Sequence, residues 1–170
     1  GLFGLRKNYG PIMKKTNITN KDHIKFMKEA INEAEIGLEE GGIPIGSILV
    51  HNNQIVGRGH NQRVQKGNPL LHGEMDALQN LGRQDARFYR ECIIYTTLSP
   101  CIMCSGTIVH YKIPLVIIGE NETTEATTFC EDFLVDNNIE LINMNLDQCK
   151  LMMKHFIQNN EELWYEDISI

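Results

Sequence analysis

Residues 91–111 read ECIIYTTLSPCIMCSGTIVHY, an apolar run that passes into a segment of helical character. Isoleucine, tyrosine and threonine dominate residues 91–98, as is typical of a buried β-strand. In residues 99–111, Pro100 suits the first turn of a helix, and Ser99 is the expected N-cap. The stretch therefore predicts a strand that leads directly into a helix, the repeating unit of α/β proteins.

The same alternation of strands and helices extends upstream. The expected elements are a helix at 22–40, strands at 43–50 and 54–61, a loop at 61–70 and a helix at 71–81. Asp22 is the expected N-cap of the first helix. In the second helix Met75, Leu78 and Leu81 share one face, with Ala77 alongside, and we expect this face to be buried.

Downstream, we expect strands at 115–119 and 140–145, a helix at about 129–136, and a helical C-terminal segment with a break near Asn159 and Asn160. This order predicts a three-layer α/β/α sandwich around a central five-stranded mixed sheet. The first two strands should be antiparallel, and strands joined through helices should be parallel.

The chain of 170 residues fits one domain, which we expect to span residues 22–170. Residues 1–21 are expected to be a flexible N-terminal arm or a vector remnant rather than an organellar leader, because they lack a clean amphipathic pattern.

The net charge of −6 disfavours a nucleic-acid partner, because proteins that grip phosphates usually present a basic face. No apolar run approaches the ~20 residues that a membrane-spanning helix needs, so no membrane partner is expected. Five cysteines, an odd number, argue against a disulfide framework and favour the cytoplasm, with the nucleus also possible in a eukaryote.

Cys101 and Cys104 form a C-x-x-C pattern at the expected start of the helix after residue 98. Three interpretations are open for such a pair: a zinc half-site, a redox pair or two core cysteines. The positive end of the helix dipole lowers thiol pKa values and favours the thiolates that zinc prefers. The other cysteines, Cys92, Cys130 and Cys149, are expected to pack in the core.

His72 and Glu74 open the helix expected at 71–81, in the triplet His-Gly-Glu. Taken alone, the two residues would most simply be polar surface residues. Two helices that follow neighbouring strands can, however, point their N-termini at one spot. His72 then joins Cys101 and Cys104 as a third zinc ligand and leaves the fourth position for water, as in catalytic zinc sites. Glu74 could carry protons for that water. The joint pattern H-x-E with P-C-x-x-C is the signature of zinc deaminases that act on bases.

On these motifs the chain resembles the fungal-type cytosine deaminases of the cytidine deaminase superfamily. The resemblance runs from about Lys28 to Ile168. It is carried by the stretches EGGIPIG, GRGHNQRVQKGNPLLHGE, YTTLSPCIMCSGTI, IPLVIIGEN and ELWYEDI.

The resemblance implies one Zn²⁺ per chain on the three ligands, and Glu74 as the catalytic proton carrier. It also implies substrate contacts from six residues. Asn61 would bind the carbonyl edge of the base together with the backbone N–H of Gly73, and Asp167 would accept from the exocyclic amine. The remaining implied contacts are Trp164 as an aromatic wall, the backbone carbonyl of Ser99 beside the leaving amine, and Ile43 as a lining residue.

Members of that family carry an aromatic residue shortly after the sequence Gly-Glu-Asn, where it closes over the base. Here residues 119–121 are followed by Glu-Thr-Thr-Glu at 122–125, and the segment is slightly longer. Phe129 is the candidate replacement. The altered segment bears on the lid and therefore on the specificity for the ring.

The implied reaction is hydrolytic deamination of cytosine to uracil and ammonia in pyrimidine salvage, with zinc hydroxide attacking C4. The alternatives are deamination of another free base or heterocycle, such as guanine or isocytosine, a tRNA adenosine deaminase, and a non-enzymatic zinc module. The resemblance also implies a homodimer, for which the helix within residues 100–111 is a candidate contact.

Overall fold

The computed structural model describes residues 18–125 and 127–170 of the chain. Of the expected N-terminal arm, residues 1–17 lie outside the described residues. The elements are α1 (Asn20–Glu39), β1 (Gly46–His51), β2 (Gln54–His60), α2 (Arg63–Lys66), α3 (Gly73–Leu81), α4 (Ala86–Arg90), β3 (Cys92–Thr96), α5 (Ile102–Tyr111), β4 (Leu115–Ile118), α6 (Thr127–Asp136), β5 (Glu140–Asn143), α7 (Asp147–Asn159) and α8 (Glu161–Asp167). In this part of the chain no helix has the length and apolar character needed to cross a membrane.

The five strands form one sheet in the order β2-β1-β3-β4-β5. β1 pairs antiparallel with both β2 and β3, whereas the pairs β3–β4 and β4–β5 are parallel. Every strand that is joined to the next one through a helix therefore runs in the same direction, and β1 alone is reversed. The expected five-stranded mixed sheet is confirmed.

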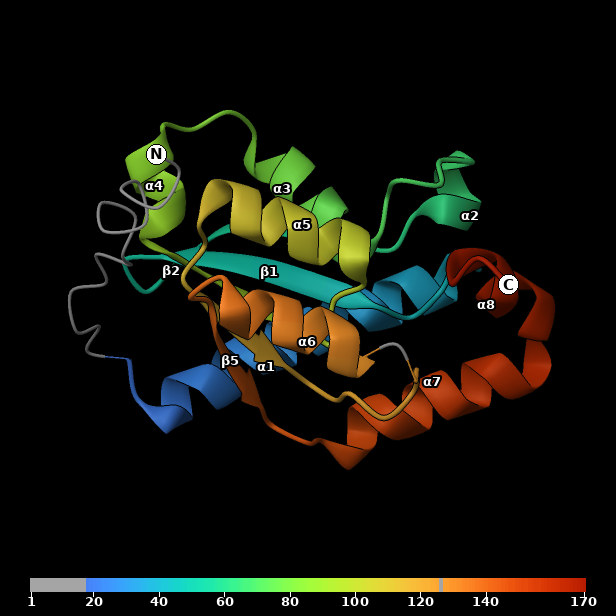
Figure 1. Cartoon of the computed structure of the whole chain (residues 1–170). Helices are drawn as coiled ribbons and strands as arrows, with labels where there is room; N and C mark the ends of the chain where they lie inside the picture. Colours follow the sequence, from blue (N-terminus) through green and yellow to red (C-terminus); the bar gives the residue numbers. More distant parts are fainter. Residues whose placement is uncertain (1–17, 126) are drawn as a thin grey trace.

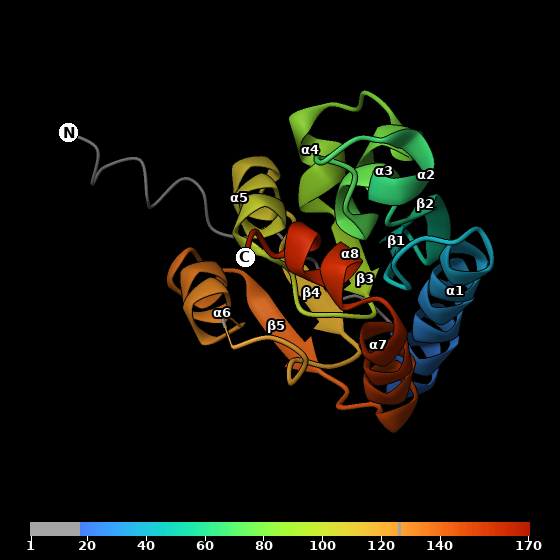
Figure 2. The same cartoon turned by 90° about the vertical axis from the view of Figure 1, so that its right-hand side faces the viewer.

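Helices cover both faces of this sheet, which gives the three layers expected from the sequence (Figure 1). Helices α1 and α7 lie on one face, and α3, α4, α5 and α6 lie on the other (Figure 2). The short helix α8 lies across the end of the sheet, between the helices of the two faces (Figure 2).

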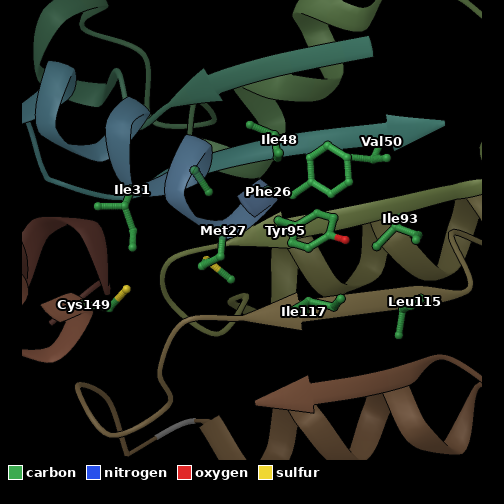
Figure 3. Packing of buried hydrophobic residues seen from close by; sticks show 11 residues of the cluster. Phe26, Met27, Ile31, Ile48, Val50, Ile93, Tyr95, Leu115, Ile117 and Cys149 are labelled. Atoms are coloured by element: carbon green, nitrogen blue, oxygen red, sulfur yellow. The ribbon is translucent and has the colours of Figure 1, made fainter. Parts of the chain in front are cut away.

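Alternating strand residues feed the two cores, since successive side chains of a strand point to opposite faces. Toward α1 the core contains Ile48, Tyr95 and Ile117, which pack with Phe26 and Met27 of that helix (Figure 3). The intervening strand residues Leu49, Ile94, Val116 and Ile118 pack against the helices of the other face. The three cysteines expected in the core, Cys92, Cys130 and Cys149, are buried.

Several expected element boundaries were wrong. Thr19, not Asp22, is the N-cap of α1; Asp22 is the N3 residue of a capping box, in which its carboxylate accepts the backbone N–H of Thr19 at 3.0 Å. The N-cap of α5 is Cys101, so Ser99 and Pro100 precede the helix. The expected loop at 61–70 contains α2, and α4 had no counterpart in the prediction.

The buried face of α3 also differs from the expectation. Met75, Leu78 and Leu81 are only partly buried, although the two leucines still pack against the core. The fully covered residues are Gly73, Glu74, Asp76 and Ala77. A helix face that buries two acidic side chains is not explained by core packing, because carboxyl groups are almost never fully buried unless they are paired.

We predict that Gly46→Ala strongly destabilises the fold. A Cβ atom at this position would lie 2.0 Å from the backbone oxygen of Ala30 and 2.5 Å from the backbone nitrogen of Ala34, where α1 crosses β1. Because both contacts are to backbone, the helix would have to move, and the free energy of unfolding should fall by about 2 kcal/mol or more.

The matched control is Gly106→Ala in α5, where an added Cβ meets no heavy atom within 4 Å among the described residues. There, replacing a mid-helix glycine should leave the free energy of unfolding unchanged or raise it by about 0.5–1 kcal/mol. Urea denaturation of both variants at one protein concentration tests the prediction. Equal losses in the two variants would contradict it.

Candidate metal and catalytic site

Two helix N-termini meet beyond the carboxyl ends of β2 and β3. His72 is the N-cap of α3, and Cys101 is the N-cap of α5. Neither side chain makes a capping hydrogen bond, although N-cap positions usually carry residues that do. The two side chains are therefore available to each other, and the expected convergence is confirmed. The expectation that the strands leading to these helices are neighbours was wrong, because β1 lies between them.

His72, Cys101 and Cys104 bring their ligand atoms within 4.8 Å of one another. The Sγ of Cys101 lies 3.3 Å from Nδ1 of His72, and Cys104 is fully buried. One imidazole and two thiols match the donor set of catalytic zinc sites, in which three protein ligands leave one position open. The residues present thus fit a zinc ion.

The second ring nitrogen of His72 supports the same conclusion. Its Nε2 lies 3.3 Å from Oδ1 of Asp167, so Nδ1 is the nitrogen that faces the two cysteines. Histidines that bind metals commonly use the other ring nitrogen to bond a carboxylate, which fixes the orientation of the ring.

The three ligand groups shift one another's pKa values. Burial alone would lower the pKa of His72, but the hydrogen bond to Cys101 and the charge of Asp167 outweigh it and raise that pKa to about 9. A hydrogen bond donated by the thiol of Cys104 is the main cause that lowers the pKa of Cys101 to about 4. The same bond, together with burial, raises the pKa of Cys104 well above its ordinary value. Without metal, the site therefore holds one thiolate beside a protonated imidazole.

Glu74 lies beside this cluster and is only 3% exposed. The hydroxyl of Thr96, at the end of β3, donates to Oε1 of Glu74 at 2.5 Å. Burial, and then the charge of Cys101, raise the pKa of the Glu74 carboxyl group. A carboxyl group with a raised pKa at a fixed position can accept and return protons, as a general acid–base catalyst must. Thr96 was not expected here, because its only signal in the sequence is a hydroxyl residue at the end of a buried strand.

The structure joins two of the expected substrate residues directly. Asn61, which is fully buried, donates from Nδ2 to Oδ1 of Asp167 at 2.9 Å. The same carboxylate oxygen contacts His72, so Asp167 links Asn61 to the metal cluster. Arg63 was not expected here; its backbone N–H donates to Oδ1 of Asn61 at 3.0 Å and fixes the orientation of the amide.

The other expected residues lie around this centre with different surroundings. Trp164 of α8 and Ile43 are buried in one apolar cluster with Leu98, a residue of the segment between β3 and α5. Gly73 is the first residue of α3, and a Cβ there would lie 3.0 Å from the backbone oxygen of Ile45. Its lack of a side chain thus lets the start of α3 approach the chain before β1.

Ser99 and the segment after β4 are held by two acidic residues. Glu131 of α6 accepts from the hydroxyl of Ser99 at 3.0 Å and from Nδ2 of Asn121 at 3.1 Å. Glu120, which is fully buried, accepts hydrogen bonds from the backbone N–H groups of Glu122 and Thr123 at 2.8 and 3.1 Å.

Phe129, the candidate lid residue, is in the first turn of α6 and is 67% exposed. Its side chain therefore does not form a closed cover in this structure.

Comparison with known proteins supports the zinc chemistry. The chain is 42% identical over 148 residues to the cytosine deaminase of Candida albicans. The aligned region covers 86% of this chain and 97% of that protein. It is 32% identical over 146 residues to the tRNA-specific adenosine deaminase of Buchnera aphidicola, with 81% of this chain and 90% of that protein covered.

A solved structure from a study of A-to-I editing by tRNA:A34 deaminases shares the fold, with a TM-score of 0.65 at 18% identity over 76% of this chain and 99% of that chain. The model of the cytidine and deoxycytidylate deaminase zinc-binding region matches residues 20–120, which include the three ligands and Glu74. The chain therefore belongs to the cytidine and deoxycytidylate deaminase family of zinc-binding proteins.

Proposed function

We propose that this protein, as a single deaminase domain, hydrolyses the exocyclic C–N bond of cytosine and releases uracil and ammonia. The observation that carries the proposal is the placement of buried Glu74 beside a cluster of one imidazole and two thiols, with the Asn61–Asp167 pair on the other side of His72. The similarity to a cytosine deaminase over 86% of the chain favours cytosine among the possible bases.

In this proposal His72, Cys101 and Cys104 hold the zinc ion, which when bound supplies Lewis-acid activation of a water molecule. Glu74 accepts a proton from that water and delivers it to N3 of the ring, which makes C4 more electrophilic. Once the oxygen of the water has bonded to C4, Glu74 takes the second proton of that oxygen and delivers it to the amine. The C4–N bond then breaks, ammonia leaves, and C4 keeps the oxygen as the carbonyl group of uracil. The hydrogen bond from Thr96 holds the Glu74 carboxyl group in place for both transfers.

Few directional bonds are needed to hold a neutral base. Asn61 offers both a donor and an acceptor, which match a ring N–H beside a carbonyl group, and the backbone N–H of Gly73 adds a second donor. Asp167 accepts from the exocyclic amine, and the backbone carbonyl of Ser99 receives the leaving group. Trp164 and Ile43 supply the apolar walls.

Pyrimidine salvage in the cytoplasm is the setting that this reaction implies, and we propose that the protein acts there as a homodimer. Ile102 and Tyr111, at the two ends of α5, are 50% and 42% exposed and are apolar enough to contribute to a contact between subunits. Light scattering coupled to gel filtration tests the dimer.

An assay of ammonia release tests the proposed substrate. The zinc-loaded protein is incubated separately with cytosine, cytidine, isocytosine, guanine and a tRNA anticodon stem. We expect turnover of cytosine above all the others. Guanine and isocytosine are included because no aromatic residue occupies positions 122–125, where relatives carry the residue that closes over the base. Turnover of either base without turnover of cytosine would assign the protein to another free base.

Replacement of Glu74 by glutamine tests the proton carrier. The glutamine amide would keep the acceptor for Thr96 but could not accept a proton, so kcat should fall by about 10²–10⁴-fold. Zinc content, measured by atomic emission, should stay at one ion per chain. Glu39→Gln, on the exposed end of α1, is the matched control and should keep full activity. A Glu74→Gln protein that retains full activity would overturn the mechanism.

Zinc binding should release protons, and the pKa values of the ligands give their number. At neutral pH His72, with a pKa of about 9, and Cys104, with a raised pKa, each hold a proton that zinc must displace, whereas Cys101, with a pKa of about 4, does not. Addition of zinc to the apo-protein should thus release about two protons, and zinc affinity should rise between neutral pH and about pH 9.

Calorimetry of zinc binding in two buffers of different ionisation enthalpy measures that release. His72→Gln removes one of the two titrating groups, so the variant should bind zinc more weakly and release about one proton. Release of no protons by the wild-type protein would contradict the assignment of the ligands.

A further inference from the structure

Asp76 is a buried acidic residue of α3 for which neither the metal cluster nor the proton transfer accounts. It lies two residues after Glu74 and is fully inaccessible to solvent. Placing a carboxyl group in the interior is unfavourable unless hydrogen bonds compensate. The contacts of Asp76 therefore indicate what it does.

A single oxygen of Asp76 accepts two hydrogen bonds, one from the last residue of β2 and one from the segment that follows it. The backbone N–H of His60 and the Nε2 of Gln62 each donate to Oδ2 of Asp76 at 3.0 Å. His60 and Gln62 are the two neighbours of Asn61 in the chain. Asp76 thus binds the backbone of the residue before Asn61 and the side chain of the residue after it.

The chain at Asn61 is held by two further backbone bonds. The N–H of Asn61 donates to the oxygen of Ile45, and the N–H of Gln62 donates to the oxygen of Leu71, both at 2.9 Å. Leu71 directly precedes the metal ligand His72. The segment that carries Asn61 is therefore tied both to the chain before β1 and to the start of α3.

Gly59 allows this close approach. A Cβ at position 59 would lie 2.6 Å from Oδ2 of Asp76 and 2.5 Å from the backbone nitrogen of Ala77. No side chain fits between the end of β2 and α3 at this point. The glycine and the carboxyl group together set the distance between the strand that leads to Asn61 and the helix that carries Glu74.

We infer that Asp76 is a positioning residue for substrate recognition. Its bonds to His60 and Gln62 fix the position of the Asn61 amide. That position is fixed relative to α3, which carries Glu74 and has His72 as its N-cap. The inference rests on the proposed function, since it assigns the position of Asn61 to the binding of the base. Errors of about 1 Å in such a position can reduce activity by about 10²-fold.

A purely structural role explains the contacts less well. The second carboxyl oxygen of Asp76, Oδ1, is buried and has no hydrogen-bond partner among residues 18–125 and 127–170. Because one of the two carboxyl oxygens makes no hydrogen bond, burial of Asp76 has an uncompensated desolvation cost. A carboxyl group is therefore a poor choice if its only role is to stabilise the contact between α3 and β2. The bonds that it does make both converge on the neighbours of one substrate residue.

The test compares steady-state kinetics of Asp76→Ala and Asp76→Asn with the wild-type enzyme on cytosine. Asp76→Ala leaves Asn61 without its anchor, so KM should rise about 10-fold to 100-fold, whereas kcat should change by less than about threefold. Asp76→Asn keeps an oxygen that can accept both donors, and its KM should lie within about threefold of the wild-type value.

Asp85→Ala is the control for lost stability without lost positioning. Asp85 also accepts a backbone N–H, from Phe88 at 2.8 Å, but it does so at the exposed N-cap of α4. Its removal should lower the melting temperature and leave KM unchanged. Equal KM values for Asp76→Ala and Asp85→Ala, or an Asp76→Asn enzyme as impaired as Asp76→Ala, would overturn the inference.

Gln62→Leu keeps the test decisive if Asp76→Ala does not fold. It removes only one of the two donors to Asp76, so the protein should stay folded, and KM should rise about threefold to tenfold. An unchanged KM in folded Gln62→Leu would also overturn the inference.

A measurement without substrate separates this inference from the proposed function. The side-chain amide of Asn61 gives its own ¹⁵N–¹H signals in the NMR spectrum, assigned with an Asn61→Asp variant. Those signals should shift in Asp76→Ala and stay in place in Asp76→Asn and Asp85→Ala. If cytosine is not turned over, the proposed function fails, and the shift of the Asn61 signals still decides whether Asp76 positions that residue.

Discussion

The contact between His72 and Cys101 is the interaction on which the site depends. It joins the N-caps of α3 and α5 through a side-chain distance of 3.3 Å. The two helices can meet there only because β2 and β3 run in the same direction and deliver both helix starts to the same end of the sheet. The reversed strand β1 between them sets the spacing. The common direction of β2 and β3 thus brings the metal ligands at the two helix starts together.

Around that contact the protein buries polar groups that a stable core would exclude. Glu74, Thr96, Asn61 and Asp76 are all at most 3% exposed. Thr96 donates to Glu74, and Asp76 accepts from the two chain neighbours of Asn61, so hydrogen bonds within the protein fix the geometry of the site. The apolar layers on both faces of the sheet offset the free energy that such burial requires. Such a site is rigid because its polar groups have few alternative partners.

The sequence was sufficient to predict the parts of this design that are local. The order of strands and helices follows from hydrophobic periodicity, and the ligands and Glu74 lie in two short motifs at helix starts. The helices α2 and α4 were missed because about one turn of helix has almost no periodicity to detect. The caps of α1 and α5 were placed at the wrong residues because helix boundaries are encoded less sharply than the helices themselves. Asp167 was expected from the family resemblance alone, since its bond to Asn61 spans 106 positions and no local pattern encodes such a contact. The prediction of the buried face of α3 was wrong. It assumed that apolar packing would bury the leucines, whereas the hydrogen bonds of Glu74 and Asp76 place these two acidic residues on the buried face.

The position of α8 limits what can reach the metal cluster. Asp167 is the last residue of this helix, and one of its oxygens contacts both Asn61 and His72. Its side chain is 4% exposed, and that of His72 is 12% exposed, so α8 covers the cluster on this side. A substrate must either fit beneath α8 or displace it and break both contacts. Under the proposed function a free base would meet the first condition, because its amine can donate to the other oxygen of Asp167 and leave both contacts in place. A polynucleotide would have to satisfy the second condition with a protein of net charge −6, and this contrast favours the small substrate.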